Sequence, residues 1–379
     1  MRSSLHRAYA LLLMGLAILV TQTGCADASY YLQSANGHLA LMRAARPVDD
    51  WQADSQASPG LKARLELTQR MRRFAVTDLA LPDNASYTRY ADLKRRAVVW
   101  NVVAAPEFSL TLKTWCFPVT GCVGYRGYFD EAEARALAQS LKAEGLEVSV
   151  YGVPAYSTLG WMNWAGGDPL LNTFINYPEG ELARLLFHEL AHQVVYVKDD
   201  TTFNESFATA VERLGGAQWL AKHGSPAARA DVAANAERRA QFRALTTATR
   251  RRLSDIYKMN VALETSSIKL TAMKNAAMTD FRAQYEKLKT SWVASQGTGA
   301  GQIAAYDAWV ANANNASFGA QGAYDDLVPD FEALFARVAA DAVEPDKAWP
   351  RFYDAVTRLA ALSAAERTLA LKDPGRQLP

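Results

Sequence analysis

Two helical patterns open the chain beyond its first 25 residues. Residues 26–46 and residues 61–81 carry apolar side chains mostly three and four positions apart, which is the spacing of one helix face. The segment between them, residues 47–60, is polar and has a proline near each end. The pattern predicts two helices joined by a loop.

The period changes at about residue 95, where β-branched and aromatic residues become frequent. Asp130 stands where a helix running to about residue 144 needs its N-cap. Four other segments have the composition or the alternation of strands: residues 97–103, 108–115, 125–129 and 147–153. Together they predict a small mixed β-sheet with a crossover helix.

The second half of the chain is mostly helical in pattern. A loop rich in glycine and tryptophan, residues 156–168, precedes a strongly apolar helical segment at residues 179–197. Residues 226–292 contain almost no glycine or proline, which predicts a long helical hairpin turning near residues 264–267. Residues 302–378 predict further helices broken by three prolines. We therefore expect an α+β fold that is predominantly helical.

Composition and charge exclude several classes of protein. Half of the 379 residues are hydrophobic and 21% are charged, a balance that excludes intrinsic disorder. Lys and Arg number 41 against 39 Asp and Glu, so no global field gathers a polyanion. Six arginines lie between residues 238 and 252, and in a neutral protein they are better explained as a solvated helix face. We expect no nucleic-acid partner.

The N-terminus has the features of an export signal. Two arginines precede an apolar stretch at residues 8–20, which is too short to span a bilayer as a helix. The small residues before Cys25 resemble the lipobox of bacterial lipoproteins, although Gln22 departs from it. We predict a signal peptide over residues 1–24 and a lipid on Cys25, which anchors the protein to the membrane. An ordinary secretory signal cleaved nearby is the alternative.

Both interpretations of the N-terminus place the mature protein outside the cytoplasm. A lipoprotein of this type is expected in the bacterial cell envelope, facing the periplasm, at the outer membrane. In that oxidising compartment the two remaining cysteines, Cys116 and Cys122, form a disulfide across a short segment that contains proline and glycine. A zinc site at this pair is less favoured, because no other Cys or His lies nearby to complete four ligands.

The chemistry of the chain is concentrated in the apolar segment at residues 179–197. His188, Glu189 and His192 fit the H-E-x-x-H pattern, and four residues advance a helix by about 400°, so both imidazoles face one cation. Glu189 lies about 100° round the helix and reaches a water on that cation as a general base. The alternative is two structural histidines on a buried helix, but burying them with a glutamate and no partner costs several kcal/mol.

A catalytic zinc ion needs a third protein ligand, and its identity sorts the zinc hydrolases. Lys198 stands where one class has a third histidine. Glu205 opens a second helical pattern that runs to Leu214 and is ended by Gly215 and Gly216, and Glu205 completes a His, His, Glu set for Zn²⁺. The alternative is a capping box in which Glu205 bonds back to the amide of Thr202. Four further residues are candidate substitutes as the ligand: Asp199, Asp200, Glu212 and His223.

The chain also resembles a known family along nearly all of its mature length. The resemblance is carried by residues 187–193, 203–208, 100–106, 115–118, 121–129 and 155–161. These segments are similar to those of bacterial lipoproteins that are predicted to be aminopeptidases. The resemblance implies a glutamate-zincin-like peptidase that needs zinc and acts on peptides. The loop at residues 162–169 departs from the family by its greater length.

These observations predict the following organisation and roles. A zincin-like catalytic core spans residues 95–224, after the N-terminal helices of residues 26–94 and before a C-terminal helical region at residues 225–379. Tyr156 is the candidate donor to the oxyanion, with Tyr196 behind it, although either ring can simply pack. Thr209 or Glu212 can hold a ligand histidine in place. The edge of the strand at residues 147–153 can pair with an extended peptide.

The function expected from the sequence is zinc-dependent peptide hydrolysis with Glu189 as the general base. No glycine, methionine and glutamate signature for binding an α-ammonium is identifiable, so aminopeptidase and endopeptidase remain open. One alternative is a non-catalytic envelope interaction protein with a structural or vestigial zinc site. Another is hydrolysis of a different amide or ester, such as a peptidoglycan stem peptide.

Overall fold

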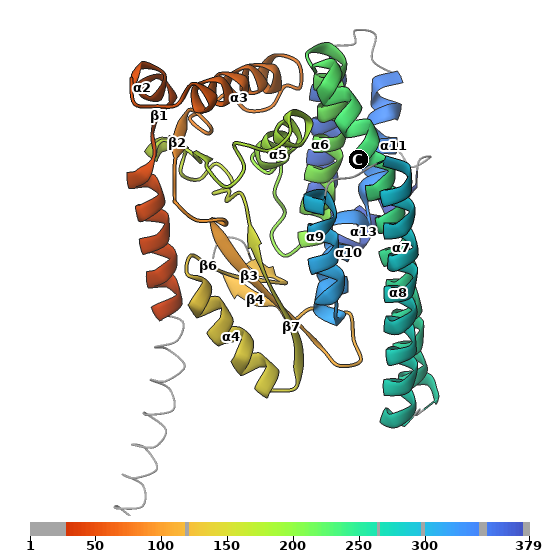
Figure 1. The fold of residues 1–379 in the computed structure, drawn as a ribbon. Helices are drawn as coiled ribbons and strands as arrows, with labels where there is room; N and C mark the ends of the chain where they lie inside the picture. The colour runs from red at the N-terminus through yellow and green to blue at the C-terminus, as the bar shows by residue number, and fades with distance from the viewer. Residues whose placement is uncertain (1–27, 118–120, 264–265, 297–299, 341–346, 374–379) are drawn as a thin grey trace, which may run out of the picture.

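The computed structural model describes residues 28–117, 121–263, 266–296, 300–340 and 347–373 (Figure 1). It is an α+β fold that is predominantly helical, as the sequence predicts. The predicted signal peptide and Cys25 lie outside the described residues. Within them, no helix is long and apolar enough to cross a membrane.

The N-terminal region contains more structure than the pattern predicts. A helix over residues 28–44 is followed by β1 (Arg46–Pro47), α2 (Val48–Ala53) and α3 (Pro59–Thr77). The prediction of a loop over residues 47–60 is therefore wrong where α2 forms. α3 begins at Pro59 because the Ser58 side chain accepts a hydrogen bond from the Leu61 amide and proline fits the first helical position.

The central sheet is small and antiparallel. β3 (Val99–Pro106) lies between β6 (Arg126–Tyr128) and β7 (Leu146–Val153). α4 (Glu131–Ala143) packs on this sheet, and its predicted N-cap Asp130 accepts from the amides of Ala132 and Glu133. The only parallel pairing in the described residues joins β2 (Arg89–Ala91) to β8 (Leu170–Leu171), in a second sheet with β1. Three of the predicted strands thus share one antiparallel sheet instead of a mixed one, and the parallel pair lies in a second sheet that the pattern does not predict.

Two strand predictions need correction. Residues 108–115 form no strand before β4 (Trp115–Phe117), although the Lys113 amide donates to the carbonyl oxygen of Ala104, beyond the part of β3 that pairs with β6. β4 instead forms a two-stranded ribbon with β5 (Gly121–Val123). The outer edge of β7 is not free along its whole length, since the Asn314 side chain donates to the carbonyl oxygen of Val148.

The two helices that carry the chemistry differ from their predicted lengths. α5 (Glu179–Ala191) ends six residues before the predicted end, with His192 as its C-cap. α6 (Thr201–Lys222) does not end at Gly215 and Gly216. These glycines let α6 approach its neighbours, because a Cβ atom there would stand 2.7 Å from Leu79 and 2.5 Å from Arg184. They serve helix packing rather than helix termination.

The predicted long hairpin is confirmed by α7 (Pro226–Leu263) and α8 (Ser267–Gln296), which lie side by side in Figure 1. Part of its predicted turn, residues 264–265, lies outside the described residues. The remaining helices are α9 (Ala300–Ala311), α10 (Asn315–Asp325), α11 (Val328–Ala340), α12 (Ala348–Ala360) and α13 (Ala364–Lys372). Pro329 and Pro350 lie in the first turns of α11 and α12, so they start helices where the prediction had them break helices. Pro345 lies outside the described residues.

Apolar side chains form two large clusters. The first apolar cluster joins α3, α5, α6, α11 and α12, and its members include Phe187, Phe207, Phe331 and Phe352. The second apolar cluster joins α7 to α10 and includes Phe242, Phe281, Tyr285 and Phe318. α5 and α6 are therefore fixed by the first cluster, and the hairpin has a core of its own.

Candidate metal centre

α5 carries two histidines on one face and buries the other face. Leu186, Phe187 and Leu190 are buried in the first apolar cluster. His188 and His192 point to the same side, with ring centroids 4.8 Å apart. His192 occupies the C-cap, where its backbone is still helical, so the one-turn spacing survives although the helix ends there. The predicted stacking of the two imidazoles is thereby explained.

α6 brings Glu205 to the histidines. Its N-cap is Asp200, whose side chain accepts from the Phe203 amide at 3.0 Å, while Thr202 already lies inside the helix. The capping-box alternative for Glu205 is therefore wrong. The side chain of Asn204 accepts from the Val197 amide at 2.8 Å and donates to the Val197 carbonyl at 2.7 Å. These two bonds fix the connection that returns the chain from α5 to α6.

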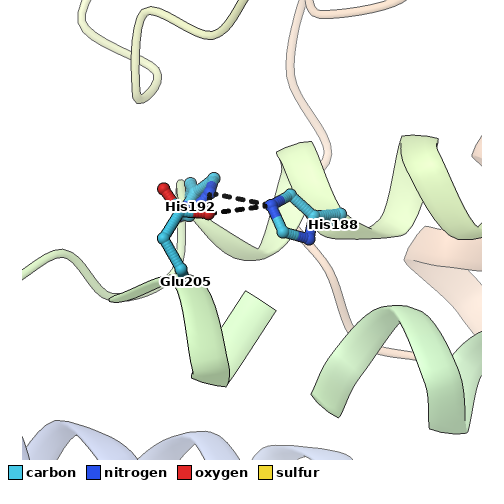
Figure 2. Close-up of side chains that lie close together, drawn as sticks. All are labelled: His188, His192 and Glu205. Carbon is cyan, nitrogen blue, oxygen red and sulfur yellow. Dashed lines mark hydrogen bonds and ion pairs between the residues drawn. The ribbon is translucent and has the colours of Figure 1, made fainter. Parts of the chain in front are cut away.

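His188, His192 and Glu205 form a three-donor cluster (Figure 2). The Nε2 atoms of the two histidines are 3.2 Å apart, and Glu205 Oε2 lies 3.3 Å from His188 Nε2 and 3.6 Å from His192 Nε2. Tetrahedral ligands about 2.0–2.2 Å from a zinc ion stand roughly 3.3–3.6 Å from one another. The three donor atoms therefore fit one tetrahedral cation, and the set leaves a fourth position open.

Three of the four substitute ligands, Asp199, Asp200 and His223, are engaged elsewhere in the described residues. Asp199 accepts from the Cys122 amide at 2.5 Å, and Asp200 caps α6 and pairs with Arg367 at 2.8 Å. His223 packs on the rings of Trp219 and Phe74 at the end of α6. None of these residues joins the three-donor cluster.

Glu212 contacts the cluster through Nδ1 of His188, the ring nitrogen that is not one of the three donors. Its Oε2 lies 3.0 Å from Nδ1 of His188, and its Oε1 accepts from Arg184 at 2.5 Å. Of the two residues predicted to hold a ligand histidine, Thr209 or Glu212, the structure places Glu212 in that position. A carboxylate on Nδ1 fixes the ring and leaves Nε2 free for a metal. His192 differs, because its Nδ1 is buried and has no hydrogen-bond partner in the described part of the chain.

The charges in this cluster shift one another's pKa values. Burial lowers the pKa of His188, but hydrogen bonds to Glu205 and Glu212 outweigh it and hold the pKa well above its usual value. Burial raises the pKa of Glu205, yet the two histidines lower it to about 2. The pKa of Glu212 is also lowered, because His188 and Arg184 outweigh the effect of burial. Both carboxylates are thus ionised at neutral pH, which is the state that binds a metal and a histidine.

Glu189 stands beside the donors without joining them. Burial raises its pKa, and the positive charges of His188 and His192 act in the opposite direction. A carboxylate that binds protons more tightly than an exposed glutamate suits a general base near neutral pH. Its position follows directly from its place between the two histidines on α5.

The charge of Glu205 acts on three tyrosines, two of which the sequence does not indicate. Burial, and to a smaller extent the charge of Glu205, raises the pKa of Tyr196 to about 12. The same two causes raise the pKa of Tyr151 to about 12. Burial and Glu205 raise the pKa of Tyr125 well above its usual value. Tyr156 packs on the rings of His38 and Phe129, with its pKa raised to about 12 by burial and by Asp168. Sequence reasoning missed Tyr125 and Tyr151, although both lie in segments it singled out.

The loop over residues 156–168 is tied to the end of α5. Asn163 and Asn84 donate to the side-chain oxygen of Gln193, the residue after His192, at 3.4 and 2.7 Å. Asp168, only 1% exposed, accepts from the Thr158 amide at 3.0 Å. Gly167 has a positive φ of 63°, and a Cβ atom there would stand 2.4 Å from the backbone nitrogen of Ser86. The loop is therefore fixed beside the donors.

Two further features flank the metal centre. Cys116 and Cys122 form a disulfide between β4 and β5. A cavity of about 910 Å³ lies between residues 108–114, the start of α6, α7 and α10. Thr202, which lines the cavity, is one helical turn before Glu205. The cavity thus borders the helix that supplies the third donor.

Comparisons with known proteins identify a family and no individual relative. No curated protein and no solved structure matches the chain. The sequence profile of one family, described as "Putative aminopeptidase", matches residues 29–371. The match covers the donors, the loop beside them and both apolar clusters, and the chain belongs to this family.

Proposed function

We propose that this protein is a zinc-dependent metallopeptidase with a glutamate-zincin type of site. The observation that carries the proposal is the set of three distances between His188 Nε2, His192 Nε2 and Glu205 Oε2. The family to which the chain belongs supports a peptidase. The donor set also supports a hydrolase over a structural zinc site, because a structural site has four protein ligands and the cluster in the described residues has three.

Bound zinc would supply a Lewis acid that polarises the scissile carbonyl and lowers the pKa of a water. The chain's own residues do the rest. Glu189 accepts the proton of the attacking water and later delivers it to the leaving amine. Glu212 holds the His188 ring through Nδ1, so that Nε2 keeps its direction.

A hydrogen-bond donor to the developing oxyanion completes the proposal. Tyr156 is the donor predicted from the sequence, and Tyr196 is the tyrosine near both Glu205 and Asp199. Replacing each by phenylalanine removes the hydroxyl and keeps the ring. Loss of one oxyanion donor costs about 10²–10³ in kcat, so the two variants identify which hydroxyl acts.

The experiment that tests the function uses the purified, zinc-loaded protein and a mixed pool of peptides, half of them N-acetylated. Mass spectrometry reads the products. Release of single N-terminal residues from the free peptides alone establishes an aminopeptidase, whereas internal cuts in both halves establish an endopeptidase. No cleavage by a protein that holds zinc contradicts the proposal and favours a non-catalytic role.

We also propose that the protein is exported and lipidated on Cys25, facing the periplasm in the bacterial envelope. The support is the arrangement of residues 1–25 described above. Labelling cells with a radioactive fatty acid tests it, with Cys25→Ala as the matched control. Equal labelling of both proteins, or none in either, contradicts lipidation.

A further inference from the structure

A chain of charged groups leads from the helical hairpin to a metal ligand. Arg239 on α7 pairs with Glu181 Oε1 on α5, and the other oxygen of Glu181 lies 3.8 Å from Arg184. Arg184 donates to Glu212 on α6, and Glu212 contacts His188 Nδ1. This series of charged groups thus extends over three helices, α7, α5 and α6, before it reaches His188.

The chain of charges is shielded from solvent at each step. The side chains of Arg239 and Glu181 are 22% and 29% exposed, and those of Arg184 and Glu212 are 17% and 18% exposed. Charge pairs in such surroundings are screened less than exposed pairs, and leaving one member without its partner is costly. The orientation of each group therefore depends on the next.

The packing of α7 against α5 makes the Arg239–Glu181 ion pair possible. Gly180 precedes Glu181, and a Cβ atom at Gly180 would stand 2.4 Å from a methyl group of Val232 on α7. Ala228, in the first turn of α7, is buried in the first apolar cluster. The beginning of α7 is thus pressed against the beginning of α5, which brings Arg239 within reach of Glu181.

We infer that Arg239 and Glu181 are positioning residues for the metal centre, so that the helical hairpin is part of the zinc site. With Arg239 in place, the charge of Glu181 is shared between two arginines, and Arg184 stays directed at Glu212. Without Arg239, Glu181 competes with Glu212 for Arg184, and the bond that fixes the His188 ring weakens. Zinc affinity then falls although no ligand has changed.

The inference rests on the proposed zinc site, and the test separates the two. The dissociation constant for zinc is measured by competition with a fluorescent chelator. We expect Glu212→Gln to weaken binding by roughly 10- to 100-fold, and Arg239→Ala by about three- to tenfold. Arg239→Lys should restore part of the loss. Arg252→Ala removes an arginine from the same helix, one that pairs with Asp280 on α8, and should match the wild type.

A merely structural role for Arg239 makes a different prediction. It lowers the urea midpoint of the metal-free protein and leaves the zinc dissociation constant unchanged, and that result overturns the inference. So does an Arg239→Ala effect of equal size in the Glu212→Gln background, because the coupling must pass through Glu212. If Arg239→Ala does not fold, Arg239→Gln keeps most of the stem and serves in its place. A wild-type protein that binds no zinc overturns the metal centre itself.

Discussion

The α5–α6 pair and the α7–α8 hairpin are held together in opposite ways. Between α5 and α6, five ionisable side chains meet in or beside the buried three-donor cluster, and their pKa values are shifted. Between α7 and α8, interlocked aromatic rings fill the second apolar cluster, and the Arg252–Asp280 ion pair that joins the two helices lies at the surface. The first pair therefore keeps charges where they cost the most to bury.

The difference indicates that the two regions have different roles: stabilisation of the fold in the hairpin and binding of a cation between α5 and α6. An apolar hairpin core stabilises by burial and needs no charged group. A buried cluster of carboxylates and histidines is poorly stabilising until a cation neutralises it, because each ion loses its hydration. Metal binding is thus expected to stabilise α5 and α6 far more than α7 and α8.

The largest expected effect is the loss of catalysis without loss of metal. Glu189→Gln removes the proposed general base and keeps the size of the side chain, so kcat should fall by about 10²–10⁴ while zinc stays bound at one equivalent. Peptide cleavage and metal content by atomic absorption check it. Glu133→Gln, on the exposed side of α4, is the matched control. Unchanged turnover in Glu189→Gln excludes this residue from the reaction.

Creating a cavity in each apolar cluster by mutation tests the comparison between the two regions. Phe207 on α6 and Phe281 on α8 are buried to 0% and 1% exposure, and truncation of either to alanine should cost about 3–5 kcal/mol of unfolding free energy. Only Phe207→Ala should also weaken zinc binding, because Phe207 lies two residues after Glu205. Urea unfolding of the metal-free proteins and chelator competition measure the two quantities. Equal zinc affinity in both variants contradicts the claim that only the first apolar cluster supports the zinc ligands.

Asp168 provides a pH-dependent test next to the metal centre. Burial raises its pKa from 3.8 to about 6, so the folded protein binds this proton more tightly than the unfolded chain. Stability from this group is therefore full below pH 4 and is lost as the pH rises through about 6. Asp168→Asn removes the loss, and the variant should gain on the wild type by up to about 3 kcal/mol across this interval. Parallel pH profiles of urea unfolding exclude this effect.

The sequence predicts the metal centre better than the fold around it. The one-turn spacing of His188 and His192 is a local property of a helix, and it places both rings whatever the rest of the chain does. The side chain of Asn204 fixes the turn at Val197, which returns the chain so that Glu205 meets the two histidines. That turn is also formed by residues close in sequence, so the distance along the sequence from His192 to Glu205 could indicate the third donor.

Contacts between distant segments were beyond the reach of a single sequence. Nothing local shows that Gly215 and Gly216 let α6 pack against α5 and against Leu79, just after α3, so they were interpreted as a helix end. Residues 108–115 alternate like a strand, yet before β4 they pass β3 as a loop whose Lys113 amide donates to the Ala104 carbonyl. The approach of Tyr125 and Tyr151 to Glu205 likewise follows from the sheet packing and not from a motif.

The smallest expected effect comes from the surface of the hairpin. Arg252 and Asp280 are 2.8 Å apart, with their side chains 49% and 48% exposed, so solvent and salt screen their attraction. Arg252→Ala should change the unfolding free energy by less than about 1 kcal/mol. Thermal unfolding at low and at 1 M salt measures it, and the difference from wild type should shrink at high salt. A loss of several kcal/mol that salt does not reduce would show that charge pairs, and not the aromatic cluster, hold the hairpin together.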